Sequence, residues 1–198
     1  WAPEGEQEIF SLDEMIKIWD PARISKSPAI FDPLKLRAIN AAYIRALPAE
    51  EFRKLADPFI DQAVHVQIDR DLLCVNLQPR CEVLEDIPPQ LDFFDAVLPI
   101  DAEMYRNKKQ KTTPESAKEA LSALLPVLEA QTDWSRDAIF EACKQKAEAM
   151  EKKNGWLLFP LGIALSGKAR TPGGGTDLAA MMGKEETLRR LNAAIEAL

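Results

Sequence analysis

Few side chains in this sequence could carry acid, base or nucleophilic chemistry. His65 is the only histidine, which excludes most catalytic schemes and most metal sites that depend on imidazole. Cys74, Cys81 and Cys143 are well separated and lack CxxC spacing, so they indicate neither a zinc site nor a disulfide framework. Carboxylates are abundant, but in an acidic helical protein they usually form solvated helix faces. The sequence therefore predicts buried or idle thiols, and it does not support a small enzyme that uses a cysteine or paired carboxylates.

Two short segments have some features of a phosphate-binding loop. Residues 171–176, Thr-Pro-Gly-Gly-Gly-Thr, contain consecutive backbone N–H groups that could surround an anion. They lack the GxxxxGK[ST] pattern, because no lysine follows before Lys184, and this favours a simple turn. Residues 23–27, Arg-Ile-Ser-Lys-Ser, resemble the ATP loop of class I aminoacyl-tRNA synthetases, yet no strand-rich nucleotide fold precedes them. The proline and the helix cap that follow them indicate a structural turn.

The composition is that of a folded protein. The chain has 198 residues, 46% of them apolar, and only 8 glycines. This length and apolar content are enough for one or two domains with cores of their own. No apolar run approaches the roughly 18 to 20 residues that span a bilayer, and the N-terminus has no basic region followed by an apolar stretch. We therefore expect a cytoplasmic protein without a membrane segment.

The formal net charge is −7, which weighs against a general nucleic-acid binder because nonspecific binding depends on lysine and arginine. A specific binder remains open, since the charges are segregated along the chain. Acidic residues crowd 82–103, whereas basic residues gather at 23–45, 106–111 and 168–170. The sequence predicts a polarised surface.

Capping residues, prolines and apolar periodicity predict an all-α fold. Helices are expected over 11–19, 33–47, 48–59, 69–78, 114–130, 136–153 and 184–198, with an apolar element over 156–165. Pro126 should kink or shorten its helix, and Asn154 with Gly155 should end the preceding helix with a left-handed residue. Prolines between 86 and 99 predict a domain junction, and no run alternates long enough to require a sheet.

Residues 10–44, "FSLDEMIKIWDPARISKSPAIFDPLKLRAINAAYI", resemble a segment of bacterial glutamyl-tRNA synthetases with the pattern SKSPAxFDxxKLxWxNxxYI. The matching residues are Ser25, Lys26, Ser27, Pro28, Ala29, Phe31, Asp32, Lys35, Leu36, Asn40, Tyr43 and Ile44. Residues 79–94, "PRCEVLEDIPPQLDFF", and the block 160–191, with "ALSGKARTPGG" and "GKEETLRR", are similar to two further family motifs. The resemblance spans almost the whole chain in the family order.

This resemblance implies helical anticodon-binding domains of the class I α-helix cage type. Residues 1–47 would end the stem-contact domain, and 48–94 and 95–198 would be two anticodon-binding domains. The chain would recognise the anticodon of tRNA-Glu as a monomer, without a cofactor or catalytic residue of its own. An absent N-terminal domain would carry out glutamylation with ATP and magnesium, so this part should be inactive alone.

The resemblance also implies roles for individual residues. Arg80 falls on an arginine that reads the third anticodon base and separates tRNA-Glu from tRNA-Gln, and a guanidinium presents a rigid fork of donors suited to base acceptors. Thr171 and Pro172 match residues that approach splayed anticodon bases, with following glycines that permit close approach. The candidates for contacts with the tRNA backbone are Lys26, Arg37, Arg45, Lys168 and Arg170.

Two positions depart from the family pattern. Gly162 replaces an arginine that helps to hold the first anticodon base, so that contact is in doubt. Ala38 replaces a tryptophan, which predicts a hole unless a neighbour such as Trp19 fills it.

Two alternatives stay open. Arg80 could be a surface arginine paired with Glu82 or Glu85. The chain could also be a free-standing helical interaction module that has lost RNA binding, an idea that Gly162 and the negative net charge favour.

Overall fold

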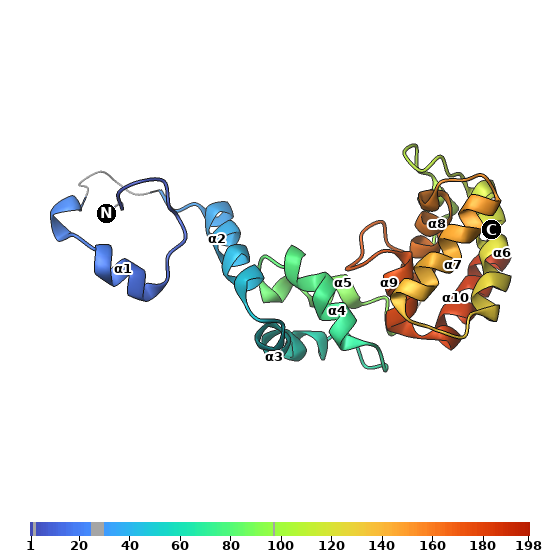
Figure 1. Ribbon diagram of the computed structural model, residues 1–198, viewed down its shortest axis with the longest axis horizontal. Helices are drawn as coiled ribbons and strands as arrows, with labels where there is room; N and C mark the ends of the chain where they lie inside the picture. Colours follow the sequence, from blue (N-terminus) through green and yellow to red (C-terminus); the bar gives the residue numbers. More distant parts are fainter. Residues whose placement is uncertain (2, 25–29, 97) are drawn as a thin grey trace.

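The structure, a computed structural model, describes residues 1, 3–24, 30–96 and 98–198. It confirms the all-α prediction: in these ranges the only β interaction is one isolated antiparallel bridge between Asn107 and Thr112. Figure 1 shows an elongated arrangement with α1 at one end, α2 to α5 in the middle, and α6 to α10 grouped at the other end. None of the described helices is long and apolar enough to cross a membrane.

The helix bounds follow the predicted segments closely. The α-helices are α1 (Leu12–Ile18), α2 (Pro33–Ala46), α3 (Ala49–Ile60), α4 (Arg70–Leu77), α5 (Pro88–Leu91), α6 (Pro114–Ala130), α7 (Arg136–Ala149), α8 (Asn154–Ser166), α9 (Gly175–Met182) and α10 (Lys184–Ala197). Short 3-10 helices are η1 (Pro21–Arg23), η2 (Gln78–Arg80), η3 (Leu84–Asp86) and η4 (Ala102–Tyr105).

Local capping explains where several of these helices begin. Ser11 and Glu14 form the expected capping box at α1, and the Asp32 carboxylate accepts from the backbone N–H groups of Leu34 and Lys35 at α2. Thr113 caps α6 with Pro114 at the first helical position. Each cap satisfies N–H groups that have no partner inside the helix.

One expectation about helix ends was wrong. The helix predicted to reach 153 ends at Ala149, and the left-handed residue is Glu151, with φ 54°, whereas Asn154 and Gly155 are the first residues of α8. The predicted end of α6 is confirmed: the helix continues past Pro126 to Ala130, so this proline does not shorten it. α9 was not predicted.

The last five helices pack around α8. This helix is apolar on all sides and buries most of its side chains, as expected for a helix enclosed by others. It contacts α6, α7, α9 and α10. The turn that carries Thr171 leaves the carboxyl end of this central helix, so its base is fixed by the core.

The middle group is smaller. On α3, Phe52, Ala56 and Ile60 follow a helical period and are buried, and this face packs against α4, η3 and α5. The Gln78 amide donates to the carbonyls of Ile44 and Leu47, at 3.0 and 2.8 Å. It thereby ties η2 to the carboxyl end of α2.

The expected hole at position 38 does not exist. Ala38 is exposed on α2, and Trp19 is itself 54% exposed. A small side chain at a solvent-facing position leaves no cavity, so nothing has to fill it.

Candidate nucleic-acid interface

Arg80 and Thr171 lie together. Arg80 ends η2 and is exposed, and its Nη1 donates to the backbone oxygen of Thr171 at 3.1 Å. Gln78, two residues earlier, anchors the same short helix to α2. The structure therefore brings Arg80 into contact with the turn that carries Thr171, and both residues were anticodon-binding candidates from the sequence.

Of the two carboxylates considered as partners of Arg80, Glu82 and Glu85, the first is paired with another arginine. Glu82 accepts from Arg37 Nε at 2.9 Å, and Arg37 also contacts Asp86. The hydrogen bond that Arg37 donates to Glu82 is the main reason that the pKa of Arg37 is raised. Within the described ranges no carboxylate pairs with Arg80, so its remaining N–H donors are not committed to an ion pair.

The Thr171 turn, residues 167–174, is held by its own Thr171 and by side chains of two neighbouring helices. Gly167 has a left-handed backbone, with φ 64°. The Thr171 hydroxyl donates to the Gly173 carbonyl at 2.6 Å, and Gly174 N donates to the Asp177 carboxylate at 2.7 Å. Arg136 Nε binds the other oxygen of that carboxylate at 2.9 Å. The turn is therefore a defined structure attached to α7 and α9.

The glycines of the turn serve internal packing. A Cβ at Gly173 would lie 2.6 Å from the Asp177 Cβ, and a Cβ at Gly175 would lie 2.8 Å from the Leu158 carbonyl oxygen and 2.9 Å from Gly162 N. Contacts this short do not occur between real side chains and backbone. Gly173 and Gly175 therefore permit close approach between protein segments. Pro172 is buried, so its ring presents no open face for a base.

The five backbone-contact candidates differ in what they already bind. Lys168 Nζ donates to the Pro89 carbonyl at 2.7 Å and pairs with Asp92, and Arg37 is paired as described above. Arg45 and Arg170 are exposed. Lys26 lies outside the described residues, as do residues 25–27 of the turn expected over 23–27. Two of the five side chains therefore have structural roles in the unbound chain.

The thiols fit the prediction of buried, unreactive groups. All three cysteines are free and buried. Burial raises the pKa of Cys81 to about 11 and that of Cys143 to about 12, and it also raises the pKa of Cys74. His65 pairs with Asp95 on the surface, Nδ1 to Oδ2 at 2.5 Å. The cysteines therefore lack the lowered pKa of a nucleophilic thiol, and His65 is paired with Asp95 rather than with a cysteine.

Three residues that hold the interface together were not anticipated. Gln78 fixes η2, Asp177 organises the turn, and Arg190 reaches into the core from α10. Two local spacings carried a signal in the sequence. Glu186 and Arg190 are four residues apart and share a helix face, and Asp177 lies three residues after Gly174, the cap of α9, as in a capping box. The contacts of Gln78, and those of Arg190 with backbone carbonyls, join segments remote in the sequence.

Comparison with known proteins places the chain in a family. A family profile described as "Anticodon binding domain" matches residues 40–195. Glutamate–tRNA ligases of Clostridium botulinum strain Hall and Clostridium acetobutylicum are each 42% identical over the whole chain, which spans 41% of their length. The match is to their C-terminal part, and it gives no support to a free-standing module.

Solved structures give the same answer. The crystal structure of a glutamate tRNA ligase from Elizabethkingia meningosepticum CCUG26117 matches all of this chain over 39% of its own, with a TM-score of 0.84 and 29% identity. The glutamate-tRNA synthetase from Elizabethkingia anophelis matches 99% of this chain over 38% of its own, with a TM-score of 0.77 and 27% identity. With the family profile covering most of the sequence, this chain belongs to the anticodon-binding domain family.

Proposed function

We propose that this chain is the tRNA-binding part of a cytoplasmic glutamate–tRNA ligase, that it acts as a monomer, and that it reads the anticodon of tRNA-Glu. The remainder of such a ligase would activate glutamate with ATP and magnesium and transfer it to the tRNA. Neither cofactor is assigned to this chain. Within the described ranges no group of three or more histidine, cysteine, aspartate or glutamate side chains is arranged to hold a metal ion.

The observation that carries the proposal is the contact between Arg80 and the Thr171 turn. A guanidinium has five N–H donors, and here one is used on a backbone oxygen while the side chain stays exposed. The remaining donors can bind the edge of an unstacked base, as in single-stranded RNA recognition. The exposed Arg170, next to Thr171, adds positive charge at the same turn.

The proposal assigns different roles to the arginines. Arg80 would contact a base and so distinguish sequences, whereas Arg45 and Arg170 would contact phosphates and so act on any anticodon. Lys168 and Arg37 would reach RNA only by leaving Asp92 and Glu82. Lys26 is proposed as a phosphate contact from the family resemblance alone.

A binding titration tests this function. We would measure the Kd of the chain for tRNA-Glu and for a variant changed at the third anticodon base, at low salt, with Arg80→Ala and with Arg45→Ala as the matched exposed control. The unsubstituted chain should prefer tRNA-Glu to the anticodon variant, and Arg80→Ala should reduce this preference by about 5- to 150-fold, the contribution of one good base contact. Arg45→Ala should weaken both RNAs equally.

The result that would overturn the proposal is equal binding of both RNAs by the unsubstituted chain. Unchanged preference in Arg80→Ala would remove Arg80 from the base-reading role.

A further inference from the structure

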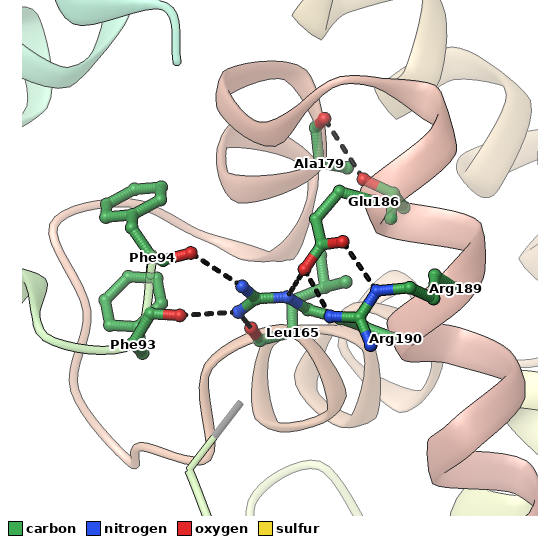
Figure 2. A network of polar contacts seen from close by, with 8 residues as sticks. Phe93, Phe94, Leu165, Ala179, Glu186, Arg189 and Arg190 are labelled. Atoms are coloured by element: carbon green, nitrogen blue, oxygen red, sulfur yellow. Dashed lines mark hydrogen bonds and ion pairs between the residues drawn. The ribbon is translucent and has the colours of Figure 1, made fainter. Parts of the chain in front are cut away.

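Arg190 of α10 is buried at a junction between two parts of the molecule. Its side chain is 1% exposed. Nη1 donates to the carbonyls of Phe93 and Leu165 at 2.6 and 2.7 Å, Nη2 donates to the Phe94 carbonyl at 2.8 Å, and Nε binds Glu186 at 2.5 Å. Figure 2 shows these carbonyls converging on one guanidinium.

One of these acceptors belongs to the base of the Thr171 turn. Leu165 lies in the last turn of α8, where carbonyls have no partner inside the helix. Arg190 supplies that partner at 2.7 Å. The chain then passes through Ser166 and the left-handed Gly167 into the turn, so Arg190 fixes the point from which the turn departs.

The other two acceptors belong to the segment that follows Arg80. The rings of Phe93 and Phe94 are stacked, with centroids 4.4 Å apart, and are 0% and 2% exposed. This segment continues from α5, which packs on α3 and η3. Holding these carbonyls therefore holds the middle group that carries Arg80.

The other hydrogen bonds between the two groups are longer or more exposed. Asp69 N donates to the Met181 carbonyl at 3.0 Å, and Lys168 reaches the Pro89 carbonyl with a side chain 21% exposed. Water can replace bonds made at the surface, but buried carbonyls that lose a charged donor stay unpaired. Among these hydrogen bonds, those of Arg190 therefore contribute most to a single fixed placement, beside the apolar core that the two groups share.

We propose that Arg190 is a positioning residue. Its hydrogen bonds to the Phe93–Phe94 segment and to the end of α8 set the separation between Arg80 and the Thr171 turn. Its effect on RNA rests on the function proposed above. Its effect on geometry does not.

Distance measurement tests the geometric part directly. Spin labels would be placed at Lys54→Cys in α3 and Lys118→Cys in α6, both exposed, because the three native thiols are buried. Arg190→Met removes all the donors while Glu186 keeps its bonds to Arg189. Arg189→Met, on the same helix and paired with the same carboxylate, is the matched control.

We expect a single narrow distance distribution for the unsubstituted chain and for Arg189→Met, and a broadened or shifted one for Arg190→Met. Arg190→Lys should be intermediate, because an ammonium lacks the planar fork needed to span these acceptors. An unchanged distribution in a folded Arg190→Met overturns the proposal. If Arg190→Met does not fold, a distribution for Arg190→Lys identical to that of the unsubstituted chain overturns it.

A second experiment, an RNA-binding titration, measures the ratio of Kd values for tRNA-Glu and the anticodon variant. In Arg190→Met the ratio should move towards 1 even though the residue is too deeply buried to touch RNA, and Arg189→Met should leave it unchanged. A ratio of 1 for the unsubstituted chain would defeat the proposed function but leave the distance result standing. An unchanged ratio in Arg190→Met would show that Arg190 does not affect discrimination between anticodons.

Discussion

The Arg80 guanidinium donates to the Thr171 carbonyl at 3.1 Å across a sequence separation of 91 residues. This contact joins the middle helical group to the turn between α8 and α9. It orients Arg80 without an ion pair to any carboxylate in the described part of the chain. An arginine held in this way is preorganised to donate to a further acceptor, which reduces the entropy cost of binding.

Arg80→Lys should separate charge from geometry. A lysine retains the positive charge but not the planar fork, so we expect the salt dependence of tRNA affinity to stay close to that of the unsubstituted chain. The preference between anticodons should fall by about 1 to 3 kcal/mol. Kd values for two anticodons across a salt series would measure both effects. Full retention of the preference would show that charge alone suffices at this position.

Gly175→Ala should destabilise the fold and Gly162→Ala should not. A Cβ at 175 would lie 2.8 Å from the Leu158 carbonyl oxygen, whereas a Cβ at 162 would find its nearest neighbour at 3.7 Å. We expect a loss of about 1 to 3 kcal/mol for Gly175→Ala from overpacking. For Gly162→Ala, inside α8, we expect a gain of about 0.5 to 1 kcal/mol from helix propensity. Urea unfolding of the two variants tests the contrast, and equal effects would contradict it.

Acid should remove the stabilisation that comes from Glu186. Hydrogen bonds from Arg189 and then Arg190 lower the pKa of Glu186 to about 2, from an ordinary value of 4.5. A carboxylate with a lowered pKa stabilises the fold fully above its unfolded pKa, and this contribution is lost as the pH falls through the folded pKa. The difference in unfolding free energy between the unsubstituted chain and Glu186→Gln should therefore shrink between about pH 4.5 and pH 2. A difference that is constant with pH would contradict this assignment.

The thiols should react slowly in the native chain. Burial raises the pKa of Cys143 to about 12 and that of Cys81 to about 11, and only the thiolate is nucleophilic. Alkylation at neutral pH should modify none of the three cysteines quickly, and unfolding in urea should expose all of them. Peptide mapping by mass spectrometry would identify the site, and rapid native labelling of Cys143 would contradict its burial.

Local signals in the sequence were sufficient to predict most of the helices and where they begin. The Ser11–Glu14 capping box, the Asp32 cap and the Thr113 cap with Pro114 act within four residues, so they are visible without a fold. The errors arose where packing overrides local preference. Asn154 and Gly155 have the composition of a helix end, but the apolar residues that follow belong to the central helix, which starts at Asn154.

The sequence by itself determined the helical class, the family resemblance and the pairing of Arg80 with the Thr171 turn as candidates. Only the tertiary structure decided which cations are already engaged: Arg37 binds Glu82, 45 residues away, and Arg190 binds Phe93, 97 residues away. The physical reason is that a side chain's partners and its exposure depend on which remote backbone segments the packed helices bring beside it. Helical periodicity and capping describe each segment alone and contain no information on those distances.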